Sequence, residues 1–105
     1  MEDKAYVLQQ NESCMGFLQR ALGGQVSADT IKMIDILLEI VIPEISASDY
    51  SLSLCHHARE IELIISHNGK AIKEEMMDII EDLVDGLHYR HQSRNHHTLK
   101  IIKRE

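Results

Sequence analysis

Aromatic residues are scarce in this sequence, and tryptophan is absent. Only 4% of its 105 residues are aromatic, so a core has to be built from isoleucine, leucine, methionine and valine. Such aliphatic side chains favour packing between helices over an aromatic-rich sheet. The hydrophobic fraction of 44% is ordinary for a folded chain and excludes wholesale disorder. Length and composition together predict one folded domain.

Long apolar runs are also lacking. The longest, IKMIDILLEIVI, contains Lys32, Asp35 and Glu39, and it is shorter than the roughly 20 residues that span a bilayer. The first ten residues are charged and lack the apolar stretch of a signal peptide. Cys14 and Cys55 form no C-x-x-C pair, and we interpret both as buried, reduced thiols. These absences predict a cytoplasmic protein without membrane contact.

Charge is distributed unevenly along the chain, whose net charge is −6. Residues 1–87 contain 16 acidic and 6 basic residues, whereas residues 88–105 contain 5 basic residues and 1 acidic residue. The acidic part repels the phosphates of nucleic acids, and only the basic end attracts them. Because Tyr89 is the only aromatic residue there, we expect any nucleic-acid binding by this end to be weak and salt-sensitive.

The spacing of apolar residues predicts four helices. Their expected bounds are about Asn11 to Leu22, Ser27 or Asp29 to Ile42, Asp49 to His67, and Lys70 to His91. Glycines at Gly23-Gly24 and Asn68-Gly69 are typical of helix ends, and Pro43 is expected to break the second helix. The two halves also align at a spacing of 46 residues, each as helix, glycine turn and helix.

The predicted fold is therefore all-α, a four-helix arrangement of two helical hairpins joined near Pro43. Residues 1–91 form a single helical domain, and residues 92–105 form a basic, histidine-containing C-terminal tail. That tail is compatible with a frayed end, a short helix or an added strand. The apolar arc of the second helix is too wide for a small bundle to cover, which predicts a homodimer.

The stretch from Glu74 to His97 contains six carboxylates and four histidines. At about 100° per residue, the acidic side chains fall on one side of the predicted fourth helix, opposite its apolar residues. Solvated helix faces usually mix charges of both signs, because like charges four residues apart repel. A face of one sign is either simply solvated or a docking surface for a basic protein partner. The candidate partner-binding residues are Glu74, Glu75, Asp78, Glu81, Asp82 and Asp85.

Glu75 and Asp78 form an E-x-x-D motif within KEEMMDIIEDLVDGL. The motif resembles one helix of the all-α nucleotide pyrophosphohydrolases related to MazG, and the resemblance implies carboxylates that bind Mg²⁺ for diphosphate hydrolysis. That family carries an E-E-x-x-E motif on the preceding helix, whereas this chain offers only Glu60 and Glu62. Side chains two apart on a helix do not share a face. We therefore expect a protein that is not an enzyme.

Histidines supply another hypothesis. His88 and His91 would lie on one turn of the predicted helix, with Asp85 as a third candidate metal ligand. His96 and His97 would join them if the tail folded back. No standard zinc spacing of cysteine and histidine is present, so no cofactor is predicted. The seven histidines would also move the net charge from −6 towards zero below about pH 6.5.

These features predict a small acidic regulatory or inhibitory module that binds a basic protein partner. Antitoxins, toxin-immunity proteins, anti-activators and connector proteins are classes of this kind. The alternatives are the Mg²⁺-dependent pyrophosphohydrolase and a regulator that responds to metal or pH through its histidines.

Overall fold

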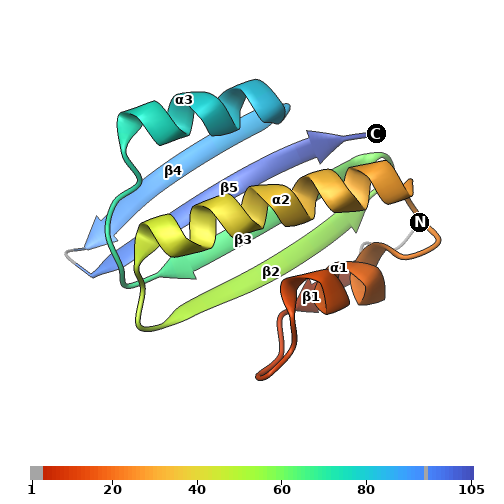
Figure 1. The fold of residues 1–105 in the computed structure, drawn as a ribbon, viewed down its shortest axis with the longest axis horizontal. Coiled ribbons are helices and arrows are strands. Elements are labelled where there is room, and N and C mark those ends of the chain that lie inside the picture. Colours follow the sequence, from red (N-terminus) through yellow and green to blue (C-terminus); the bar gives the residue numbers. More distant parts are fainter. Residues whose placement is uncertain (1–3, 94) are drawn as a thin grey trace.

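The computed structural model describes residues 4–93 and 95–105 and contains three helices and five strands (Figure 1). In chain order the elements are β1 (Lys4–Val7), α1 (Cys14–Leu22), α2 (Ala28–Ile45), β2 (Tyr50–His57), β3 (Glu60–His67), α3 (Glu74–Leu83), β4 (Gly86–Ser93) and β5 (His96–Arg104). Within the described residues, no helix is both long enough and apolar enough to cross a membrane.

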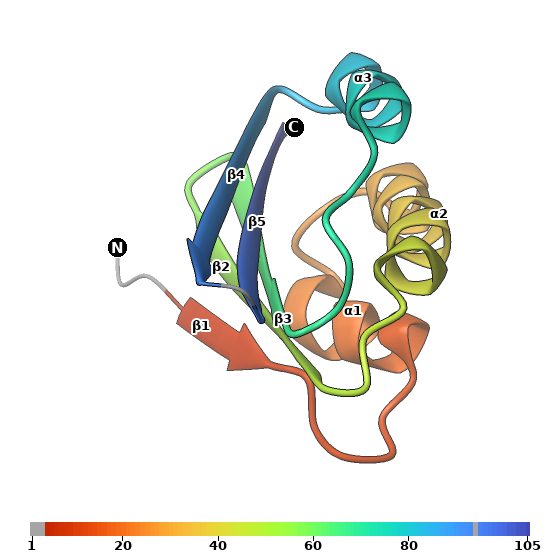
Figure 2. The same ribbon diagram turned by 90° about the vertical axis from the view of Figure 1, so that its left-hand side faces the viewer.

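The strands form one antiparallel sheet in the order β1-β2-β3-β5-β4. Figure 2 shows that all three helices lie on the same side of this sheet, so the fold has two layers. Because successive side chains of a strand point to opposite faces, every second residue of the central strands is buried beneath the helices. These residues are Ile61, Leu63, Ile65 and His67 on β3, and His97, Leu99 and Ile101 on β5.

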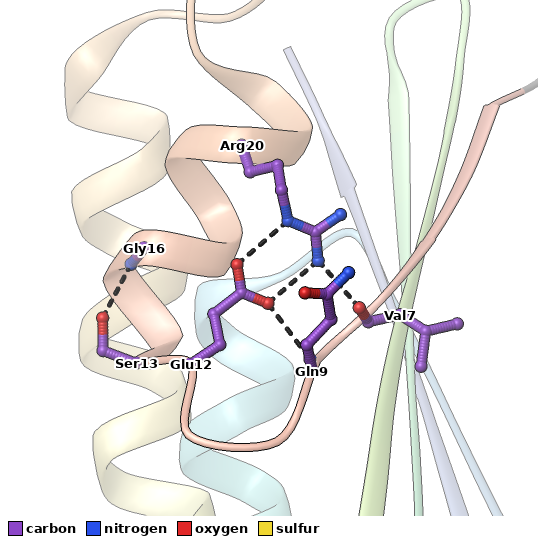
Figure 3. A network of polar contacts seen from close by, with 6 residues as sticks. All are labelled: Val7, Gln9, Glu12, Ser13, Gly16 and Arg20. Carbon is purple, nitrogen blue, oxygen red and sulfur yellow. Dashed lines mark hydrogen bonds and ion pairs between the residues drawn. The ribbon is translucent and has the colours of Figure 1, made fainter.

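The helices α1 and α2 supply the other half of the core, and each begins at a serine cap. The hydroxyl of Ser13 accepts a hydrogen bond from the N–H of Gly16 at 3.0 Å (Figure 3), and the hydroxyl of Ser27 accepts one from the N–H of Thr30 at 3.2 Å. The buried residues are Phe17, Leu18, Ala21 and Leu22 on α1, and Ile31, Ile34, Leu37, Leu38, Val41 and Ile45 on α2.

The first two predicted helices are confirmed as α1 and α2, with two differences: α1 begins at Cys14 rather than Asn11, and the second helix does not end at Pro43. Pro43 does not break the second helix but lies in its last turn, and α2 continues to Ile45. A proline so near a helix end removes a single backbone hydrogen bond. The helix then closes through a 3.3 Å hydrogen bond from the N–H of Ser46 to the carbonyl of Pro43.

The predicted all-α fold is wrong, because the chain contains a five-stranded sheet. The segment 49–67, predicted as a helix, is the hairpin of β2 and β3, in which Leu54 lies opposite Leu63. Ala58, with a φ of 54°, makes the turn between the strands. The apolar residues of this segment fit both the spacing of a helix and the alternation of a strand. In the structure, the alternating residues are the ones buried against α2. Asn68-Gly69 therefore follows a strand and does not end a helix.

The fourth predicted helix, at 70–91, is also wrong beyond its first half. In the structure this segment contains α3, followed by the edge strand β4. Most of the segment 92–105, for which the sequence left three structures open, forms the strand β5 between β3 and β4. The 46-residue spacing is not a structural repeat, because Gly23 follows a helix whereas Gly69 follows a strand.

Candidate functional site

The acidic side chains of α3 point away from the core, as the sequence predicts. The five carboxylates of this helix are all exposed, and the described residues place no cation within ion-pair distance of them. Two of them lie in the first turn, where the helix dipole favours negative charge. We call this set the acidic face, and its members are Glu74, Glu75, Asp78, Glu81 and Asp82.

Asp85, the sixth predicted partner-binding residue, does not belong to the acidic face. It lies beyond the end of α3, and its Oδ2 accepts a 2.6 Å hydrogen bond from the N–H of Arg104. The ammonium group of Lys103 lies 3.8 Å from the same oxygen. Asp85 therefore connects the start of β4 to the end of β5 and has a structural role.

The helix α3 is attached to the sheet through few contacts. Ile80 is its one buried residue, whereas the side chains of Ile79 and Leu83 are 50% and 39% exposed. Figure 2 shows α3 at the margin of the helical layer, above β4. The acidic face thus lies on a helix that projects at one edge of the molecule.

The carboxylates implied by the pyrophosphohydrolase resemblance do not come together. Glu75 and Asp78 lie on α3, but Glu60 and Glu62 lie on β3. On that strand they alternate with the buried residues and so face away from all three helices. Glu62 pairs with Lys100 at 3.1 Å, and Glu60 pairs with a cation of the same strand β5. The fold that the resemblance implies is also absent.

His88 and His91, the two predicted histidine ligands of one helix turn, are separated from each other, although His91 lies beside His97. His88 and His91 lie on β4, where residues three apart point to opposite faces of the sheet. His88 lies opposite Lys100, and His91 lies opposite His97. Among the residues that the structure describes, no group of three or more His, Cys, Asp or Glu side chains is placed to hold a metal ion.

A row of three histidines crosses one end of the sheet. His67 on β3 lies opposite His97 on β5, which lies opposite His91 on β4. The ring centroids of His67 and His97 are 5.0 Å apart and those of His91 and His97 are 4.5 Å apart, with the planes within 15° of parallel. His67 and His97 are each 4% exposed. The Tyr89 hydroxyl lies 2.5 Å from Nδ1 of His97. We call His67, His97 and His91 the histidine row.

Burial favours neutral rings at His67 and His97. The N–H of Gly69 donates to Nδ1 of His67 at 3.0 Å, which places the proton of the neutral ring on Nε2. Burial, and then the neighbouring His97 and His96, lower the pKa of His67. Burial also lowers the pKa of His97, as do His91 and His96, against a hydrogen bond to the backbone of Gly69. The lone pairs of parallel rings do not converge on one ion, so His67 and His97 are suited to sensing protons rather than to binding a metal.

The histidine row was missed by the sequence reasoning because His67 and His91 were assigned to helices. The signal that identifies it is the alternation in EIELIISH and HHTLKII, which places His67 and His97 in the same phase as buried isoleucines and leucines.

A polar network connects β1 to α1 (Figure 3). The Nε and Nη2 atoms of Arg20 each lie 2.9 Å from an oxygen of Glu12, and Nη2 donates to the carbonyl of Val7 at 2.8 Å. The same carboxylate accepts the N–H of Gln9 at 3.1 Å. The hydrogen bonds from Arg20, and then from Gln9, lower the pKa of Glu12 to about 2. All these contacts are internal, so the network stabilises the fold.

A comparison with protein-family models finds no match to this chain, and a search of curated proteins finds no significant relative.

Proposed function

We propose that this protein is a small regulatory or inhibitory protein that binds a basic protein partner through the acidic face of α3. The observation that carries the proposal is a helix with five exposed carboxylates and, within the described part of the chain, no cation paired with any of them. Like charges on neighbouring turns destabilise a helix. A basic partner would neutralise them on binding.

Ten carboxylates outside α3 lie in the described part of the chain, and those of α2 also have no described cation within 4 Å. Four of the ten lie within 4 Å of a cation, in the pairs Glu12–Arg20, Glu62–Lys100, Asp85–Lys103 and Glu60–Arg104. Three of the four cations belong to the basic C-terminal segment. That segment neutralises the molecule's own carboxylates, which favours a protein partner over nucleic acid.

The expected cytoplasmic location and the homodimer are parts of the same proposal. No disulfide joins Cys14 and Cys55, which suits a reducing compartment. The apolar surface of α2 that a dimer could cover is smaller than the sequence indicates, because the sheet covers most of the apolar side of this helix. Met33 and Ile36 are the large apolar residues of α2 that stay exposed. Light scattering after size-exclusion chromatography tests this part, and a strict monomer at micromolar concentration contradicts it.

The acidic face is tested by affinity enrichment with two matched variants. Asp78→Asn with Asp82→Asn removes two charges from the acidic face, and Glu60→Gln with Glu62→Gln removes two charges from the opposite face of the sheet. We expect the wild type and the second variant to retain the same basic protein and the first variant to lose it. Equal recovery by all three proteins contradicts the proposal.

The histidine row favours a second candidate function, a pH-responsive regulator. His67 accepts a hydrogen bond from Gly69, which lies in the segment that leads from β3 into α3. Protonation of Nδ1 would remove that acceptor. The groups around His67 are Tyr50 on β2, Asp49 and Asn68 at the strand ends, and the histidines of β4 and β5. Partner affinity that is constant between about pH 7.5 and about pH 5.5 would exclude this role.

A further inference from the structure

The apolar surface between α2 and α3 is not fully covered. Six large apolar side chains are exposed in the described part of the chain, and four of them lie on these two helices. They are Met33 and Ile36 on α2, with 41% and 45% exposure, and Ile79 and Leu83 on α3. Exposed apolar residues that gather in one region often mark an interaction site.

Helix geometry places these residues on facing sides of the two helices. Ile40 of α2 and Met76 of α3 line one cavity of about 320 Å³, so these two side chains mark the sides that face each other. Met33 and Ile36 lie seven and four residues before Ile40, on the same side of α2. Ile79 and Leu83 follow Met76 by three and seven residues, on the same side of α3.

The two helices run in opposite directions (Figure 1), and the cavity at Ile40 and Met76 lies at one end of the two apolar rows. Each row spans seven residues, about 10 Å or two helical turns. We call the surface between these rows the α2–α3 groove, and its residues are Met33, Ile36, Ile40, Met76, Ile79 and Leu83.

The charge around the groove identifies the kind of occupant. The helix α3 carries five acidic residues and no basic residue, and α2 carries four acidic residues and one lysine. Lys70 and Lys73 line the cavity at one end, so the surroundings of the groove stay acidic in sum. On α3, Glu75 and Asp82 lie beside Ile79 at about 40° and 60° around the helix axis. A second copy of this chain would bring a further net charge of −6 against the same surface, so the proposed homodimer has to form through another face. Charge complementarity therefore selects a basic occupant.

We propose that the α2–α3 groove binds an amphipathic helix of a basic protein partner. Apolar side chains of that helix, spaced at i, i+3 or i+4, and i+7, lie between Ile36 and Ile79, and its lysines or arginines contact the acidic face. This inference rests on the proposed function and adds to it the secondary structure and the apolar anchors of the partner.

Two labelled 16-residue peptides of leucine and lysine test the groove by fluorescence anisotropy. One places its leucines on a single helix face, and the other has the same composition in scrambled order. We expect the wild type to bind the amphipathic peptide at least ~10-fold more tightly than the scrambled one, because two or more apolar side chains become buried. Ile36→Ser with Ile79→Ser removes this preference, whereas Val7→Ser, at an exposed site on β1, preserves it.

The outcomes separate the groove from the acidic face. Equal affinity for both peptides, reduced by Asp78→Asn with Asp82→Asn, overturns the groove and preserves the acidic binding surface. A preference that depends on Ile36 and Ile79 but not on those two carboxylates supports the groove and contradicts the acidic face. If light scattering shows a dimer that Ile36→Ser with Ile79→Ser converts to a monomer, the occupant is a second copy and the proposal is overturned.

Discussion

His67 on β3 and His97 on β5 stack face to face, with ring centroids 5.0 Å apart and 15° between their planes. Both side chains are buried in phase with isoleucines and leucines of the same strands. Two imidazoles in such contact cannot both become cations without repulsion. This relationship makes this end of the sheet sensitive to acid.

The free energy of unfolding should decrease as the pH is lowered, because His67 and His97 become protonated. Their pKa values are lower in the folded chain than the ordinary value, so the unfolded chain binds protons more readily. The stabilisation is complete above about pH 6.5 and is lost as the pH falls from there through the lowered folded pKa values. We expect the melting temperature of the wild type to drop between about pH 7.5 and about pH 5.5.

The variant His67→Asn with His97→Asn tests this origin. An asparagine oxygen replaces Nδ1 as an acceptor but does not titrate, so the pH dependence of the melting temperature should become shallower. His88→Asn, on the uncovered face of the sheet, should keep the wild-type slope. An unchanged slope in the double variant would show that other groups govern the acid sensitivity.

Gly69 should not tolerate a larger residue. A Cβ atom there would lie 2.0 Å from the carbonyl oxygen of Ile45 and 2.9 Å from backbone atoms of Ala47. The Ile45 carbonyl accepts the N–H of Lys70 at 2.6 Å, so it is not free to move. Gly69→Ala should lower the free energy of unfolding by about 3 kcal/mol in urea titrations.

Gly24→Ala is the control for that clash. Gly24 has a φ of 80° and no atom within 4 Å of an added Cβ, so it carries only the strain of the left-handed conformation, about 1 kcal/mol. Equal losses for the two substitutions would mean that the contact between the Gly69 segment and the end of α2 does not stabilise the fold.

Neutralising part of the acidic face should stabilise the isolated protein. Asp78 and Asp82 lie four residues apart on exposed turns of α3, and like charges at this spacing cost roughly 0.2–0.5 kcal/mol per pair. Asp78→Asn with Asp82→Asn should raise the melting temperature at low salt, and the gain should shrink in high salt. Glu60→Gln with Glu62→Gln, which removes two ion pairs, should give no such gain.

Ile80 should be the main attachment of α3 to the sheet. It is fully buried, whereas its neighbour Ile79 is half exposed. Ile80→Ala should cost about 2–4 kcal/mol and speed hydrogen exchange of α3 amides more than that of α2 amides. Ile79→Ala should change stability by less than about 0.5 kcal/mol. Equal exchange in both helices would show that α3 does not open separately.

The sequence predicted α1, α2 and the outward direction of the acidic face, because these depend on local spacing and, for α2, on a capping residue. It failed at 49–67, where eight-residue strands on either side of a short turn carry leucines and isoleucines at spacings that fit either structure. It also failed at β5, whose place between β3 and β4 depends on partners distant in the sequence. Pairing across a sheet has no local signature.

The same difference between local and long-range structure explains which parts of the candidate sites were predictable. The carboxylates of α3 share a helix, so their common face was predictable, whereas Asp85 lies past the helix end and is engaged by β5. The histidine row joins three strands, and two of its members were assigned to helices. A site assembled across a sheet appears only once the register is known.

The most direct measurement is the dissociation constant of the recovered basic partner for three proteins. These are the wild type, Asp78→Asn with Asp82→Asn, and Glu60→Gln with Glu62→Gln. We expect the first variant to bind at least about 10-fold more weakly, mainly at low salt, and the second to bind within about twofold of the wild type. A partner that binds all three proteins with equal affinity would contradict the acidic face of α3 as the binding surface.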